Sequence, residues 1–101
     1  GSAMSRVRVH ISGDSMWPTF PDGSQFFLKP CPFEELSVGD VVLAQHPFHS
    51  TVRIVKRIQI IQDQTVFLVG DNPDPLASED SHNFGAVHHE AILGRCELIQ
   101  Q

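Results

Sequence analysis

The fold is decided by residues 51–62, TVRIVKRIQIIQ, the longest run in the chain with the alternation of a β-strand. Side chains alternate between the two faces of a strand, so the even positions share one face. They are Val52, Ile54, Lys56, Ile58 and Ile60. Lys56 therefore lies in the middle of an apolar row, whereas Arg53 and Arg57 lie on the opposite face, where water can reach them. The stretch predicts a long strand with one basic side chain on its apolar face.

A lysine on a buried face is costly unless it is neutral or well paired. Burial lowers the pKa of a lysine from its usual value of about 10.4. A neutral lysine can serve as a general base at physiological pH. Periodicity alone favours a structural alternative, in which Lys56 lies near a strand edge and extends its ammonium group outward. A catalytic role for this residue needs support from elsewhere in the chain.

The remaining sequence predicts a mainly β fold. Val and Ile together outnumber Leu and Ala, and Gly, Pro, Asp and Asn interrupt the chain often, which favours short strands joined by turns. We expect strands at 6–11, 24–28, 41–45, 65–69, 86–88 and 92–99, with a loop at 70–81. At most one short helical turn is expected, at 33–36. We interpret residues 1–4 as a cloning remnant and residues 5–101 as a single domain.

Composition excludes several classes of protein. Hydrophobic residues make up 41% of the 101 residues, too many for a disordered chain. A formal net charge of −5 argues against nucleic acid as a partner, and no apolar run is long enough to span a membrane. Two cysteines are too few for a disulfide framework, so we expect a reducing, cytoplasmic location.

Residues 13–19, GDSMWPT, place a serine on a turn between conformationally special residues. Gly13 permits a positive φ or a close backbone approach, and Pro18 stiffens the exit of the turn. A serine held in this way is suited to nucleophilic attack if a base lies nearby. Taken alone the segment is weak evidence, because serines are ordinary in turns.

Three blocks in the same order resemble the type I signal peptidases. Ser15–Thr19 resembles their Ser-Met-x-Pro-Thr box, and Val55–Ile58 resembles their lysine box. Gly70–Asn72 followed by Ser78–Ser81 resembles their last box. The resemblance extends from about residue 9 to residue 95. It implies a serine endopeptidase with a Ser/Lys dyad, on the coiled sheets or partly open barrel of the signal peptidase–LexA type.

The departures from that family narrow the choice. No membrane anchor precedes the serine box, and only residues 59–68 separate Ile58 of the lysine box from Val69, where those peptidases usually have a large insertion. A short chain without an anchor is similar to the nickel-type superoxide dismutase maturation proteases. This resemblance implies removal of an N-terminal propeptide from the nickel superoxide dismutase precursor. The alternative is a soluble catalytic domain trimmed from a membrane-anchored type I signal peptidase.

The resemblance also implies roles for individual residues. Ser15 attacks the scissile carbonyl, Lys56 accepts its proton, and the backbone N–H of Ser15 holds the oxyanion with a backbone donor near Gly13. Ser78 orients the lysine amine. Three residues are expected to brace the last box, although that box carries His82 in place of the usual arginine and two extra residues before Ser78. They are Asn72, Asp80 and His82.

We expect the substrate to bind in an extended conformation, as an added strand beside an exposed sheet edge. Neighbouring apolar side chains are candidates for its groove, although apolar residues beside a turn more often belong to the core. They are Met16, Trp17 and Phe20. No cofactor or metal is expected. The close histidine pairs, His46 with His49 and His88 with His89, lack a third ligand, and adjacent strand residues such as the second pair should point to opposite faces.

Two further functions remain as rivals. A self-cleaving repressor core also uses a Ser/Lys pair, but those proteins cut an Ala-Gly or Cys-Gly bond, and neither dipeptide occurs in this sequence. A non-enzymatic β-barrel interaction module is the other rival, in which Ser15 is only a turn residue and Lys56 is exposed. Labelling by an active-site fluorophosphonate or peptide-aldehyde probe would help to separate the enzyme from the binding module.

Overall fold

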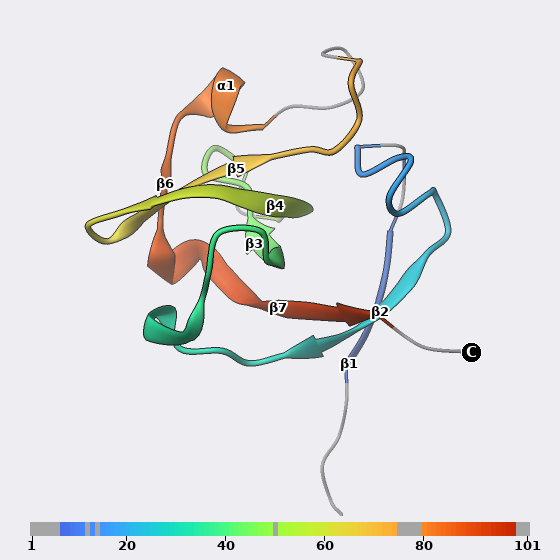
Figure 1. Cartoon of the computed structure of the whole chain (residues 1–101), viewed down its shortest axis with the longest axis horizontal. Coiled ribbons are helices and arrows are strands. Elements are labelled where there is room, and N and C mark those ends of the chain that lie inside the picture. Colours follow the sequence, from blue (N-terminus) through green and yellow to red (C-terminus); the bar gives the residue numbers. More distant parts are fainter. Residues whose placement is uncertain (1–6, 12, 14, 50, 75–79, 99–101) are drawn as a thin grey trace, which may run out of the picture.

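The computed structural model describes residues 7–11, 13, 15–49, 51–74 and 80–98. Within them seven strands form one curled antiparallel sheet in the order β1-β2-β7-β3-β4-β5-β6 (Figure 1). The strands are β1 (Val7–His10), β2 (Gln25–Lys29), β3 (Val41–Gln45), β4 (Arg53–Gln62), β5 (Thr65–Val69), β6 (Val87–His88) and β7 (Ile92–Leu98). The predicted mainly β fold is confirmed, and the expected strands agree with these to within two residues at each end.

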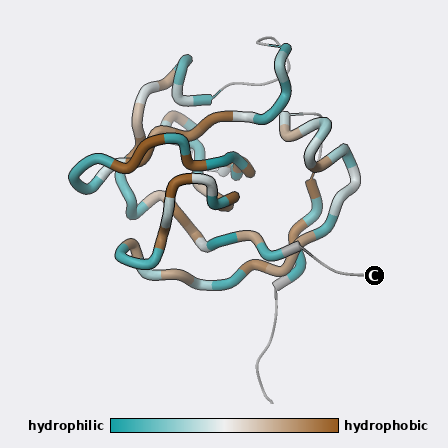
Figure 2. The backbone as a smooth tube through the Cα atoms, in the orientation of Figure 1, coloured by the Kyte–Doolittle hydropathy of each residue, from teal (hydrophilic) through white to brown (hydrophobic). Residues whose placement is uncertain are grey.

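Strand β4 crosses the centre of the molecule and changes partners along its length. Its first half, Arg53–Arg57, pairs with β3, and its second half, Arg57–Gln62, pairs with β5. The β4–β5 connection is the expected two-residue turn, in which Asp63 has a φ of 54°. The chain is hydrophobic where β3, β4 and β5 cross the middle and hydrophilic at this turn (Figure 2).

The apolar row of β4 is buried only in its middle. Ile58 is fully buried, but Val52 and Ile60 at the two ends of the row are exposed. A bulge between Ile58 and Ile60 shifts the register against β5, so that Ile61 rather than Ile60 packs on the core. Pattern reasoning predicted an unbroken row and missed this bulge, because a one-residue slip leaves no mark in a run of isoleucines.

The core lies between the middle strands and the connections that fold over them. Its buried side chains come mainly from β3, β4 and β5: Leu36, Val42, Ala44, Ile58, Val66, Leu68 and Val87. Short helical segments close the open ends of the sheet: η1 (Phe33–Glu35), α1 (Ser81–Phe84) and η2 (His89–Ala91). The helical turn expected at 33–36 corresponds to η1.

Helix α1 was not expected from the sequence, which predicted a loop up to residue 81. Asp80 begins the helix by accepting a hydrogen bond from the backbone of its first turn, and the Asn83 side chain bonds back to the Asp80 N–H. This reciprocal capping box stabilises a single helical turn locally. Four residues are too few for a helical period, so only the cap could have revealed the helix.

Candidate active site

Lys56 lies on the core side of β4 and only 2% of its surface is exposed. Burial lowers the pKa of its amine below the ordinary value of 10.5, and the negative charge of Asp80 opposes part of that shift. The structural alternative, in which the ammonium extends from a strand edge into water, does not fit a side chain with this burial. The lysine has the environment that a general base needs.

The serine turn is tied to the chain that follows β5. The Ser15 carbonyl oxygen accepts a hydrogen bond of 2.9 Å from the Asn72 N–H. Within the turn, the Phe20 N–H donates to the Met16 carbonyl oxygen at 2.7 Å. The residue that carries the hydroxyl is therefore held from both sides, by its own turn and by the Gly70–Asn72 segment.

Gly70 lies between the serine and the lysine. A Cβ atom built on it would be 2.6 Å from the Ser15 carbonyl oxygen and 3.6 Å from the Lys56 Nζ. One point beside Gly70 is thus close to both residues, although they are 41 positions apart in sequence. The structure therefore brings the Ser15 backbone and the Lys56 amine near the same point beside Gly70, where a side chain has no room.

Asp80 links α1 to the end of β5. One of its carboxylate oxygens, Oδ2, accepts from the Gly70 N–H at 3.3 Å. The other, Oδ1, accepts from the His82 N–H at 2.9 Å and lies 3.0 Å from the His82 Nδ1. Burial pushes the pKa of Asp80 up, but the hydrogen bonds from His82 and Gly70 outweigh it and lower the pKa. Asp80 and His82 are in contact, as the resemblance implies for the bracing pair.

Ser81 ties the same helix to the sheet. Its side chain is buried, and its Oγ accepts a hydrogen bond of 2.8 Å from the Leu68 N–H of β5. Sequence reasoning gave Ser81 no role of its own. The one sequence feature that could have indicated this role is the position of Ser81 directly after the N-cap Asp80. A hydroxyl in the first helical turn can reach the backbone of a neighbouring strand.

The opposite face of β4 carries an ion pair at the same level. Arg57 binds Asp71 through two nitrogens, Nε to Oδ1 at 2.9 Å and Nη2 to Oδ2 at 2.8 Å, and its Nη1 donates to the Gly39 carbonyl at 2.7 Å. The hydrogen bonds from Arg57, with a further one from Thr19, hold the pKa of Asp71 below its usual value against the effect of burial. This pair fixes the segment that holds Ser15.

The structure corrects the expected oxyanion donor near Gly13. The Gly13 N–H donates to the Asp22 Oδ1 at 2.7 Å, so it is already used within the turn. Gly13 has a φ of 91°, the positive value for which a glycine was expected. Of the proposed oxyanion donors, the backbone N–H of Ser15 remains.

The three groove candidates separate by burial. Met16 is fully buried and belongs to the core, whereas Phe20 is partly buried, with its ring packed edge-on against Phe26 at 4.8 Å. Trp17 is about half exposed beside Ser15 and remains a groove candidate. Asn72 supports the serine through its backbone, and its Oδ1 accepts from the Asp74 N–H. Ser78, predicted to orient the lysine, lies outside the described residues.

The described residues contain no group of three or more His, Cys, Asp or Glu side chains that could hold a metal ion. The rings of His88 and His89 lie 4.4 Å apart, which contradicts the expectation that they diverge. The reason is that β6 ends at His88 and η2 begins at His89, so strand alternation does not apply to the pair. Burial raises the pKa of the Cys96 thiol to about 12, which makes it unreactive.

Most of the chain matches a known protein family. The family model described as Peptidase S24-like matches residues 5–95, most of the chain. No curated protein matches the chain at a significant level. No helix within the described residues is long and apolar enough to cross a membrane.

Proposed function

We propose that this chain, which belongs to the Peptidase S24-like family, is a serine endopeptidase with Ser15 as nucleophile and Lys56 as general base. The observation that carries the proposal is the buried Lys56 amine, with its lowered pKa, beside the same point near Gly70 as the Ser15 backbone. A buried lysine next to a serine on a rigid turn is the arrangement that activates a hydroxyl without a histidine.

The reaction has two halves. The Ser15 oxygen adds to the scissile carbonyl while its proton moves to the Lys56 Nζ, and the Ser15 N–H stabilises the oxyanion. The C–N bond then breaks, the Lys56 ammonium gives its proton to the leaving amine, and an acyl-enzyme remains. In the second half, Lys56 takes a proton from water, which attacks the ester and releases Ser15. In this scheme Ser78 orients the lysine, as the resemblance to signal peptidases implies.

An open sheet edge beside Lys56 supports an extended substrate. The N–H and C=O of Ile58 both bond toward the β3 side, to Asp40 and Gly39. Because these groups alternate along a strand, those of Arg53 and Val55 point away from β3. Among the described residues no strand pairs with that edge from Arg53 to Val55, since β5 begins its pairing at Arg57. A peptide can therefore add to the sheet directly before Lys56.

We propose the nickel superoxide dismutase precursor as the substrate, with its N-terminal propeptide as the part removed. The support is the resemblance to its maturation proteases, above all the short spacing of ten residues, 59–68, between Ile58 of the lysine box and Val69. The catalytic part of a signal peptidase is the second candidate. The S24-like match is also compatible with a self-cleaving repressor core. The sequence, however, lacks the Ala-Gly and Cys-Gly bonds that such cores cut.

The test is cleavage of the purified precursor, followed by mass spectrometry of the new N-terminus. Ser15→Ala and Lys56→Met should each reduce cleavage by at least about 10³-fold. Lys29→Met is the matched control, because Lys29 is the other of the two lysines and is exposed on β2. It should leave cleavage unchanged. Retained cleavage in Lys56→Met would refute the dyad, and an enzyme active on other peptides but not on this precursor would refute the substrate.

A further inference from the structure

The hairpin between β3 and β4 carries an aromatic and aliphatic surface that the reaction chemistry does not use. Its exposed large hydrophobic residues are Phe48, with 70% of its surface accessible, and Val52, with 43%. The His46 ring lies beneath them, buried, and contacts Phe84 of α1 at a centroid distance of 5.0 Å and His49 at 4.7 Å. We name this set, Phe48, Val52, His46, His49 and Phe84, the tip surface.

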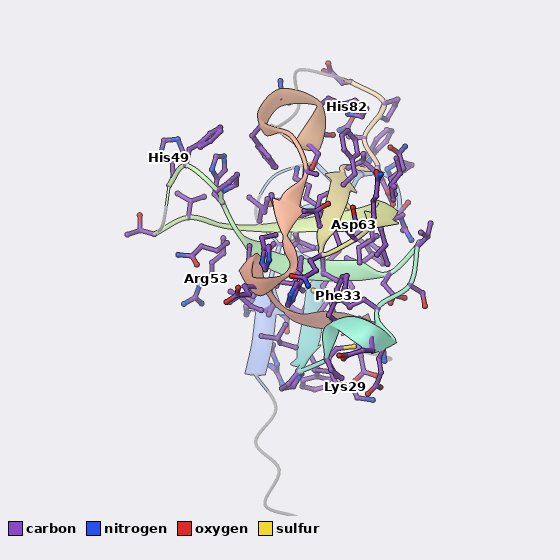
Figure 3. The ribbon with its side chains drawn as sticks, turned by 90° about the vertical axis from the view of Figure 1, so that its left-hand side faces the viewer. Lys29, Phe33, His49, Arg53, Asp63 and His82 are labelled. Atoms are coloured by element: carbon purple, nitrogen blue, oxygen red, sulfur yellow. The ribbon has the colours of Figure 1, made fainter. Side chains whose placement is uncertain are left out.

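The tip surface is ordered by its own hydrogen bonds. The His46 N–H donates to the Val52 carbonyl at 2.8 Å, and the Val52 N–H donates to the His49 carbonyl at 2.9 Å. The Phe48 N–H donates to the His46 Nδ1 at 3.1 Å. The exposure of Phe48 therefore comes from a structured turn. In Figure 3, His49 lies at the outer end of this hairpin and Arg53 further along the same side, away from His82 on α1.

The tip surface continues the open edge of β4. Val52 stands four positions before Lys56, a distance of about 13 Å along a strand, and belongs to the same alternating row. Phe84 adds a contact from α1, whose N-cap is Asp80 beside Gly70. A peptide that adds to Arg53–Val55, with its scissile bond at Lys56, must therefore reach the tip surface about four residues from that bond.

We propose that the tip surface binds an aromatic or large aliphatic side chain of the substrate, about four residues from the scissile bond. This inference rests on the proposed peptidase function and gives the enzyme a specificity determinant away from the reacting atoms. A ring packed against the exposed Phe48 and Val52 removes apolar surface from contact with water, which favours such residues over small polar ones. The surface contains no carboxylate, so its selection is by shape and apolarity.

The experiment profiles cleavage of a proteome-derived peptide library by mass spectrometry. The parent enzyme should cut peptides enriched in Phe, Trp, Leu or Ile about four residues from the bond, on one side of it. Phe48→Ser should lose that enrichment, with roughly ten-fold lower kcat/KM on peptides that carry the preferred residue. Val38→Ser is the matched control, because Val38 is an apolar residue of similar exposure on the loop before β3. It should retain the parental profile.

The outcomes separate the two proposals. Cleavage by the parent enzyme with no enrichment three to six residues from the bond, or with the same enrichment in Phe48→Ser, would overturn the tip surface alone. Absence of any Ser15-dependent cleavage would overturn the peptidase function, and the tip surface with it. Enrichment that Phe48→Ser removes and Val38→Ser keeps establishes both, whichever side of the bond it falls on.

Discussion

Lys56 and Arg57 are neighbours on β4 and have opposite environments. The Lys56 amine is buried among core strands, and its pKa is lowered by loss of water. The Arg57 guanidinium binds Asp71 and the Gly39 carbonyl on the other face, and its hydrogen bonds to Asp71 raise its pKa. Because successive side chains of a strand point to opposite faces, these two adjacent cations lie in different environments. The Lys56 amine gives up its proton more readily than an ordinary lysine, and the Arg57 guanidinium stays charged.

The difference shows how the site is assembled. Arg57 binds Asp71, the residue after Gly70, and Asn72 holds the Ser15 carbonyl. The Arg57 face of β4 therefore anchors the segment that holds the Ser15 backbone near Lys56 on the other face. Arginine suits position 57 because its planar fork binds a carboxylate through two nitrogens. Lysine suits position 56 because an arginine there would not give up its proton.

Among variants that keep both Ser15 and Lys56, the largest effect should come from filling the space between the Ser15 carbonyl and the Lys56 amine. Gly70→Ala puts a methyl group against the Ser15 carbonyl and the Lys56 amine, so the two must separate. We expect a loss of about 10²-fold in kcat, with a free energy of unfolding lower by about 1–3 kcal/mol. Steady-state kinetics and urea unfolding give the two quantities.

Gly94→Ala is the control for that change. A Cβ on Gly94 meets the Lys29 carbonyl oxygen at 2.8 Å, a clash of similar severity, but between β2 and β7. It should cost similar stability and keep kcat within a few-fold of the parent. Equal losses of kcat in both variants would show that Gly70 acts only through stability.

The next effect contrasts the two cations directly. Arg57→Met leaves the half-buried Asp71 without its main partner and should lower the free energy of unfolding at pH 7 by about 1–3 kcal/mol. Lys56→Met replaces a buried amine with an apolar chain of similar length and should leave stability unchanged or raise it. Urea denaturation of both variants measures the two changes. Destabilisation of the same size in both would contradict the assignment of the two faces.

A smaller effect is the pH dependence of the difference in free energy of unfolding between Lys56→Met and the parent. The pKa of Lys56 is lower in the folded state than its unfolded value of about 10.4. Between those two values the unfolded chain binds more protons, so the stability of the parent rises with pH. The advantage of Lys56→Met should be fully present below the folded pKa and shrink as pH rises toward 10.4. A difference that is constant from pH 6 to 10 would show that Lys56 is not desolvated.

The smallest expected effect is on the lysine itself. Asp80 raises the pKa of Lys56, so Asp80→Asn should move the rising limb of the cleavage rate against pH to lower pH. Asparagine is also a good helix N-cap, so α1 should be retained. The pH dependence of kcat/KM measures the shift. Movement of that limb to higher pH would contradict the predicted coupling.

The sequence predicts the sheet well and the connections less well. Strands that are short apolar runs between turn residues, such as β3 and β5, have the predicted bounds. The bulge in β4 and helix α1 were missed, because each depends on tertiary pairing or a single cap. Ser15 and Lys56 could be selected from their motifs. The hydrogen bond from the Gly13 N–H to the Asp22 carboxylate could not be predicted, because the partner of a backbone donor has no signature in the sequence.

The most direct test of the central claim is the titration of Lys56 in the folded parent protein. The chain contains two lysines, so ¹³C-labelled lysine gives two ε-carbon signals, and the Lys56→Met variant assigns them. The account predicts that the Lys56 signal titrates below 10.5 and that the cleavage rate levels off at the same pH. A Lys56 signal that titrates at or above 10.5, with a rate still rising there, would contradict a neutral lysine as the base.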